Sequence, residues 1–156
     1  MKKKLIIIAI ISILIDQISK FIIVSNFSIS SSITVIPSFF SIMFVKNTGA
    51  AWGIFSNGTL ILAIASIIFL LFAIKYIYEL KTISKLSVFT YATLIGGIIG
   101  NLIDRLFRGY VVDFLSFNIF GYSFPVFNIA DIFIVVSIIL IVIESIWKEG
   151  KNNDRR

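Results

Sequence analysis

The sequence predicts an α-helical integral membrane protein with four transmembrane helices. Hydrophobic residues make up 58% of the 156 residues, whereas about 45–50% is usual in soluble domains. Four apolar stretches approach the roughly 20 residues that are needed to cross a bilayer. They cover about residues 5–24, 59–78, 86–103 and 126–147. We expect them to form a single membrane domain over residues 1–156.

The basic residues predict the orientation of these spans. Lys and Arg are enriched in cytoplasmic loops, and most of the 14 basic residues lie on one predicted side: Lys2, Lys3, Lys4, Lys75, Lys81, Lys85, Lys148, Lys151, Arg155 and Arg156. Both termini are therefore expected in the cytoplasm. The first span resembles a signal peptide, but no small-x-small site follows it, so we expect it to remain uncleaved. No basic stripe with interleaved aromatics indicates a nucleic-acid partner.

The two longer links are expected on the extracytoplasmic side. Residues 25–58 contain a partly alternating segment and a β-prone aromatic segment, punctuated by Pro and Gly, which predicts a small sheet at the outer interface. Residues 104–125 are rich in Phe and Tyr. These aromatics suit either an interfacial belt or an apolar groove for a lipid or peptide, and the sequence favours neither.

The chain contains no Cys and no His. This composition excludes thiol and histidine-based catalysis, so an acid or base must come from Asp, Glu, Lys or Tyr. Asp113 and Asp131 lie beside strongly apolar segments, where a carboxylate is costly and usually functional. Two such groups suggest a shared proton. Asp131 has a second explanation, since Asn128 can cap the fourth helix and Asp131 can complement its dipole.

Further polar residues lie near the predicted outer ends of the spans. Asp16 and Lys20 share one helix face and either orient a site or form a pair whose lysine snorkels to the surface. Asn101 and Arg105 also share a face, and Asp104 with Arg105 is either part of a site or a simple surface pair.

Small residues recur at two places. Residues 46–53 form a Gly- and Ala-rich loop with Trp52, which allows either close approach of a ligand to the backbone or an ordinary interfacial turn. Gly96 and Gly100 are four residues apart, a spacing that predicts close helix packing.

Together these motifs resemble lipoprotein signal peptidase, the type II signal peptidase family of bacteria. The matching segments follow family order and span nearly the whole chain: residues 16–20, 47–53, 96–105, 111–114 and 124–131. Each motif alone is weak, but five of them combined with four spans are specific. A proton-coupled carrier would usually show an internal repeat, which is absent, and an assembly factor would not need five separate polar motifs.

The resemblance implies a membrane aspartic endopeptidase of the bacterial cytoplasmic membrane with an extracytoplasmic β-cradle. It implies cleavage of prolipoprotein signal peptides before a diacylglyceryl cysteine, contact with membrane lipids, sensitivity to globomycin, and no metal or cofactor. The implied catalytic pair is Asp113 and Asp131. The expected substrate-site residues are Asn47, Trp52, Gly53, Asn101, Arg105 and Asn128, and the expected supporting residues are Asp16, Lys20 and Asp104.

Overall fold

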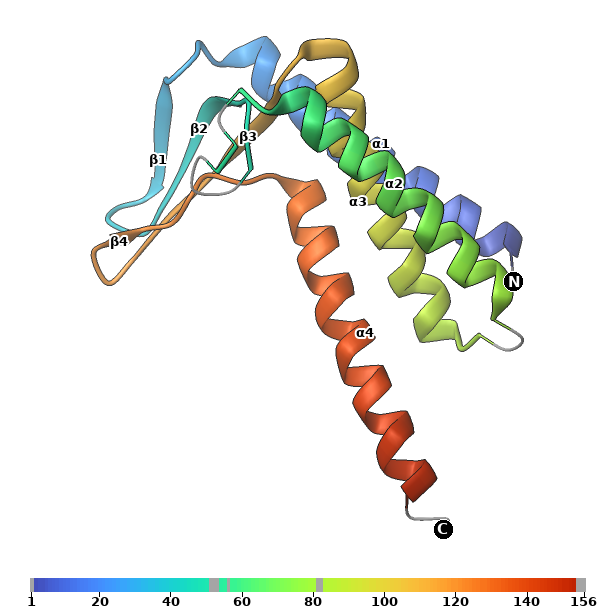
Figure 1. The fold of residues 1–156 in the computed structure, drawn as a ribbon. Helices are drawn as coiled ribbons and strands as arrows, with labels where there is room; N and C mark the ends of the chain where they lie inside the picture. Colours follow the sequence, from blue (N-terminus) through green and yellow to red (C-terminus); the bar gives the residue numbers. More distant parts are fainter. Residues whose placement is uncertain (1, 51–53, 56, 81–82, 154–156) are drawn as a thin grey trace.

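Four long helices and a small sheet make up the fold. The computed structural model describes residues 2–50, 54–55, 57–80 and 83–153. The helices are α1 (Lys2–Asn26), α2 (Thr59–Glu79), α3 (Lys85–Arg108) and α4 (Ile129–Asn153). Each contains a stretch that is long and apolar enough to cross a membrane, which in α4 is Ile129–Trp147. Figure 1 shows the sheet at one end of the helices and both termini at the ends remote from it.

The sheet combines strands from both of the longer links. Its strands are β1 (Ser32–Ile36), β2 (Phe40–Asn47), β3 (Val111–Ile119) and β4 (Tyr122–Ser123), antiparallel in that order. The predicted fold class of four helices with a small sheet is thus confirmed. The sequence indicated strands in the first link, whereas the structure also pairs the second link with it, through Val45 opposite Asp113.

The ends of α3 are set by local chemistry. Ser84 caps its start by accepting a 2.9 Å hydrogen bond from the backbone N–H of Ser87. Gly109, with φ 76°, ends it in the left-handed conformation that favours glycine. The helix therefore continues to Arg108, whereas the sequence predicted an end near residue 103. The added turn places Asp104 and Arg105 on a helix that leads directly into β3.

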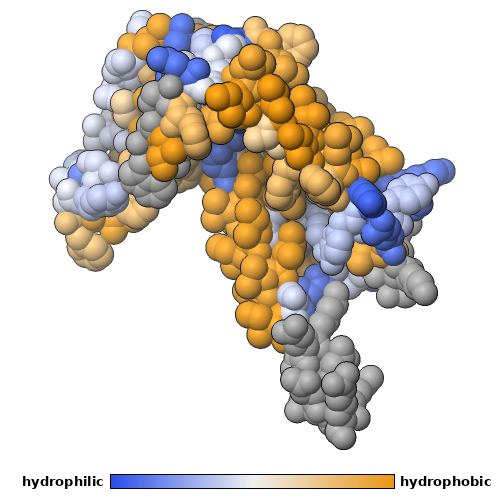
Figure 2. Space-filling model, viewed as in Figure 1, coloured by the Kyte–Doolittle hydropathy of each residue, from blue (hydrophilic) through white to orange (hydrophobic). Residues whose placement is uncertain are grey.

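Helix α3 lies at the centre of the fold and packs against the other three helices. Gly96 allows α1 to approach closely, because a Cβ at this position would lie 2.9 Å from the carbonyl oxygen of Ala9. This contact confirms the packing role predicted for the small residues. The faces of α2 and α4 that do not pack against α3 carry exposed apolar side chains, which form the hydrophobic surface in Figure 2. A lipid environment explains this exposure, since large apolar patches are rare on soluble proteins.

Candidate active site

Asp113 and Asp131 line the same cleft although they come from different elements. Asp113 lies on β3 and Asp131 in the first turn of α4. Two asparagine amides connect them. Asn128 donates from Nδ2 to Asp113 Oδ1 at 2.6 Å and to Asn101 Oδ1 at 3.2 Å. Asn101 in turn donates from Nδ2 to Asp131 Oδ1 at 2.8 Å. The fold therefore brings together the two carboxylates that the sequence singled out.

Asn128 and Asp131 also cap α4 reciprocally. The Asp131 N–H donates to Asn128 Oδ1 at 3.0 Å, and the Asn128 N–H donates to Asp131 Oδ2 at 3.1 Å. This exchange satisfies backbone donors that the helix itself cannot pair. The capping role inferred from the sequence is therefore present, and it coexists with the contact to Asn101. Each oxygen of Asp131 accepts a different donor, which fixes the orientation of the carboxylate.

The strand pairing and two amides position Asp113. Asn47, the last residue of β2, donates from Nδ2 to Asp113 Oδ2 at 2.8 Å, and its own Oδ1 accepts from the Gly49 N–H at 2.9 Å. Asp113 is only 2% exposed. Burial, followed by the negative charge of Asp131, raises the pKa of Asp113 to about 7, although the two amides and Lys20 act in the opposite direction.

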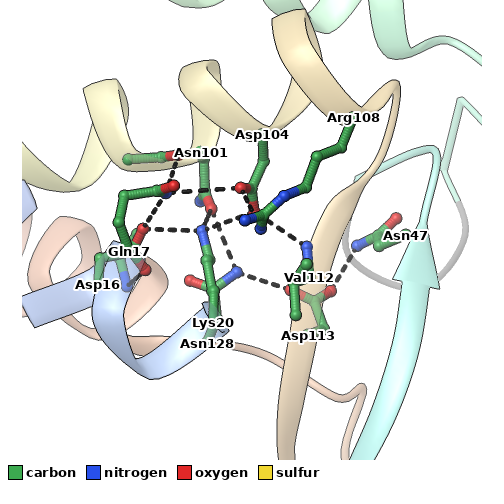
Figure 3. Close-up of polar contacts among 12 residues, drawn as sticks. Asp16, Gln17, Lys20, Asn47, Asn101, Asp104, Arg108, Val112, Asp113 and Asn128 are labelled. Carbon is green, nitrogen blue, oxygen red and sulfur yellow. Dashed lines mark hydrogen bonds and ion pairs between the residues drawn. The ribbon is translucent and has the colours of Figure 1, made fainter. Parts of the chain in front are cut away.

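Lys20 is the centre of a second polar cluster beside the pair. Its Nζ lies 2.9 Å from Asp16 Oδ2, 3.1 Å from Asp104 Oδ2 and 2.8 Å from Asn101 Oδ1 (Figure 3). The Lys20 side chain is completely buried. The alternative that Lys20 snorkels to the surface is therefore wrong. A buried lysine requires such partners, because an unpaired charge is costly away from water.

Asp104 links this cluster to the strand that carries Asp113. Its Oδ2 accepts from the Val112 N–H at 3.0 Å, and its Oδ1 lies 3.0 Å from Arg108 Nη1. The alternative of a surface pair between Asp104 and its neighbour Arg105 is therefore wrong, since Asp104 is completely buried. Sequence reasoning missed Arg108, although its spacing of four residues from Asp104 on one helix face was a usable signal.

Asp16 connects the first helix to the last. Its Oδ1 accepts from the backbone N–H of Ala130 at 3.0 Å, at the start of α4. Gln17, which sequence reasoning also missed, donates from Nε2 to Asp16 Oδ2 and to the Gly100 carbonyl, both at 3.1 Å (Figure 3). A Cβ at Gly100 would clash with the Asp16 carboxylate. The second glycine of the small-residue motif therefore makes room for the buried Asp16 carboxylate.

Arg105 lines the cleft with both aspartates. Its guanidinium interacts electrostatically with Asp131 and Asp113, yet it has no hydrogen-bond partner among the residues that the structure describes. Trp52 and Gly53, two predicted substrate-site residues, lie outside the described residues. Asn47, Asn101 and Asn128 contact the aspartates directly.

The cleft has a volume of about 690 Å³ and mainly apolar walls. One wall comes from α4, with Ile132 and Val135, and another from residues 124–127. Figure 2 shows hydrophilic atoms set back behind the apolar surface near the start of α4. Phe124 contributes to the groove, whereas Phe114 is buried in the core and Phe120 is fully exposed. The aromatics of the second link therefore serve different purposes.

Paired carboxylates in an apolar cleft beside membrane-length helices fit a membrane peptidase that uses two aspartates. The profile of the family described as Signal peptidase (SPase) II matches residues 8–147. The chain therefore belongs to the signal peptidase II family, whose members are aspartic peptidases. Membership implies cleavage of signal peptides from prolipoproteins, which are the implied substrates.

Solved structures of bacterial membrane enzymes share this fold. A bacterial membrane enzyme determined by the in meso method at 2.3 Å resolution is 38% identical, with a TM-score of 0.86 over 95% of this chain and 90% of its own. A second bacterial membrane enzyme, determined by the same method at 1.9 Å, is 39% identical, with a TM-score of 0.81 over 90% of each chain.

Proposed function

We propose that this protein cleaves prolipoproteins immediately before a cysteine that carries diacylglyceryl, with Asp113 and Asp131 as the catalytic pair. One observation carries the proposal: both carboxylates line a single apolar cleft and are joined through Asn101 and Asn128. Peptide hydrolysis by carboxylates needs such a pair, one to take a proton from water and one to give a proton to the substrate.

The charges around the pair support a shared proton. Four carboxylates, those of Asp16, Asp104, Asp113 and Asp131, face three cations, Lys20, Arg105 and Arg108. One proton on the aspartate pair makes the cluster neutral. The ionised member then takes a proton from the attacking water, while the protonated member gives its proton to the scissile carbonyl oxygen. When the tetrahedral intermediate collapses, the member that took the proton from water gives it to the leaving amine, and the other member takes back a proton from a hydroxyl of the intermediate.

Arg105 and the amides are proposed to hold the substrate. The Arg105 guanidinium, without a hydrogen-bond partner among the described residues, is available to the peptide backbone or to the developing oxyanion. Asn47, Asn101 and Asn128 orient the carboxylates. Trp52 and Gly53 are expected to contact the bound peptide from the loop that follows β2.

The apolar walls are proposed to accept the lipid and the signal peptide from the outer leaflet. Ser66 on α2 lines the cleft together with Val135 and Val136 on α4, so the cleft extends along the helices as well as toward the sheet. Acyl chains gain little by leaving lipid for apolar walls, so the lipid is proposed to anchor and orient the peptide at the cleft rather than to supply a free energy of transfer from water. Globomycin is expected to inhibit by occupying the same cleft.

Cleavage assays on the purified protein test this function. The protein in detergent should release the signal peptide from a diacylglyceryl-modified prolipoprotein and should cleave the unlipidated form poorly. The Asp131→Asn variant serves as the inactive control for contaminating peptidases. Equal cleavage of both substrates would contradict the proposed role of the lipid, and absence of cleavage of either would contradict the activity.

We also propose that the sheet faces the extracytoplasmic side and that both termini are cytoplasmic. The positions of the termini, remote from the sheet, support one side for both (Figure 1). Ser32 and Ser123 are exposed on the sheet, and the chain has no native cysteine. Ser32→Cys and Ser123→Cys should react with an impermeant thiol reagent in intact cells, and Thr82→Cys should not. The reverse pattern would invert the topology.

A further inference from the structure

Hydrogen bonds also join α3 and α4 further along the two helices than Asn101 and Asp131. Thr93 and Ser137 hydroxyls lie 2.8 Å apart, and Ser87 Oγ lies 2.6 and 2.9 Å from the two oxygens of Glu144. These contacts continue the antiparallel pairing that begins at Asn101 and Asp131, with about two helical turns between levels. We name Ser87, Thr93, Ser137 and Glu144 the α3–α4 seam.

The seam includes the one buried polar side chain of α4 among its described side chains, residues 129–147. Ser137 is 1% exposed, and the only other buried residue in that range is Ala130. Within the apolar window of α4, only 11% of the residues are buried. The position of α4 therefore depends on the flank that faces α3.

The direction of the central hydrogen bond follows from the neighbouring carbonyls. Thr93 Oγ1 lies 3.0 Å from the carbonyl oxygens of both Phe89 and Thr90. A hydroxyl has one hydrogen to donate, so Thr93 donates within its own helix and accepts from Ser137. Removal of the Ser137 hydroxyl therefore breaks the interhelical bond without disturbing the bonds within α3.

Such contacts carry more of the packing in a bilayer than in water. Lipid tails are as apolar as Leu or Ile, so helices associate through close packing and interhelical hydrogen bonds. On α3, Gly97 lies between Asn101 and Thr93. It brings the backbones of α3 and α4 together, because a Cβ there would lie 2.6 Å from the Ala130 carbonyl oxygen. Close contact and hydrogen bonding thus alternate along one line of α3.

We propose that Ser137 and Thr93 are positioning residues for Asp131. The inference rests on the proposed catalytic pair. Asp113 is held by the pairing of β3 with β2, whereas Asp131 moves with α4. The depth and rotation of α4 therefore affect how Asp131 faces Asp113, and the seam fixes them together with the contacts of Asp16 and Asn101 at the start of α4. The Ser87–Glu144 contact restrains the same helix further from the site.

Turnover by purified variants tests the seam. Ser137→Ala and Thr93→Val should each lower kcat roughly three- to tenfold with KM nearly unchanged, because interhelical hydrogen bonds are individually weak while small misplacement of reacting groups is costly. Ser137→Thr, which keeps the hydroxyl, should keep a kcat close to that of the wild type. The matched control is Ser145→Ala, since Ser145 is exposed on the same helix, and it should retain the wild-type rate.

Combined variants separate positioning from general destabilisation. The double variant Thr93→Val with Ser137→Ala should have a kcat no lower than either single variant, because both substitutions remove the same hydrogen bond. Ser87→Ala with Ser137→Ala should be worse than either. Rates are expressed per folded enzyme, measured by fluorescence-detected gel filtration. The proposal is overturned if Ser137→Ala and Thr93→Val both keep the kcat of Ser145→Ala. It is also overturned if the kcat of Ser137→Thr is as low as that of Ser137→Ala. Near-normal turnover of Asp113→Asn or Asp131→Asn in the same assay would instead refute the catalytic pair.

Discussion

Helices α3 and α4 are both long and apolar, yet α3 is mostly buried by other parts of the protein and α4 is mostly exposed. In their most apolar windows 72% of the residues of α3 are buried, against 11% for α4. The buried side of α3 contains small and polar residues, among them Thr90, Gly97 and Asn101. In a bilayer, apolar side chains gain nothing by facing another helix rather than lipid. The central helix of this membrane protein is therefore recognised by its small and polar residues. In a soluble protein the most buried helix would instead be recognised by its large apolar residues.

The two helices also contribute to the site in different ways. Helix α3 supplies Asn101, Asp104 and Arg105 from its last two turns. Helix α4 supplies Asp131 from its first turn and apolar walls beyond it. Substitutions should therefore have large effects along one face of α3, and on α4 only at its start and along the seam.

The largest effect is expected for the carboxylates. Asp131→Asn should abolish cleavage while the protein remains folded and inserted, and Asp113→Asn should do the same from the sheet. The double variant should be no worse, because the pair acts as one unit. Signal-peptide release over long incubation measures the loss. Near-normal turnover in either single variant would contradict the assignment.

The next effect is expected where α3 and α4 are closest. Gly97→Ala places a methyl group against the Ala130 carbonyl, with Ile134 Cγ1 only 3.0 Å away. Overpacking of this kind typically costs about 1–3 kcal/mol, and here it also pushes the first turn of α4 away from α3. Thermal unfolding in detergent should show a lower midpoint, together with reduced kcat. An unchanged midpoint would show that the two helices can separate freely.

The pH dependence should reflect the carboxylate pair, Asp113 on β3 and Asp131 on α4. The pKa of Asp113 is raised from 3.8 to about 7 by burial and then by Asp131. The native state therefore holds a proton that the unfolded chain loses above about pH 4, so this contribution to stability is complete at low pH and is lost as pH rises toward 7. The cleavage rate should fall as the shared proton is lost above about pH 7, and again in acid when both carboxylates are protonated.

Two controls accompany these pH profiles. The part of the stability change between about pH 4 and 7 that Asp113 causes should be absent from Asp113→Asn. A chelator should leave the rate unchanged at every pH, since the described residues contain no group of three or more His, Cys, Asp or Glu that could hold a metal ion. Activity that is lost in chelator and restored by a metal ion would contradict the carboxylate mechanism.

The smallest effect is expected on the lipid-facing side of α4. Val142 is 51% exposed and Ile139 is 52% exposed. Val142→Ala and Ile139→Val should change the unfolding midpoint and kcat very little, within the roughly 0.5 kcal/mol that is usual for exposed sites. A large loss of stability at either position would show that another surface covers α4 in the membrane.

The sequence predicted the elements of this fold better than their contacts. Apolar length indicated the four helices, and the cost of a carboxylate in apolar surroundings singled out Asp113 and Asp131. The pairing of β3 with β2 was not predictable, because strand partners distant in sequence are chosen by tertiary packing. Lys20 shows a different limit, since an Asp and a Lys four residues apart suit both a surface pair and a buried cluster.

The hydrogen bond between Asp16 and the Ala130 N–H has a consequence for biosynthesis. Its partners are 114 residues apart in the chain, so the first helix to leave the ribosome must wait for the last before this contact forms. The contact at the start of α4 therefore forms only after α4 itself has been synthesised and inserted. A nascent chain halted before α4 contains Asp113 but lacks Asp131. With Asp113 and Asp131 as the proposed catalytic pair, synthesis order keeps an incomplete chain from cleaving prolipoproteins while it is being assembled.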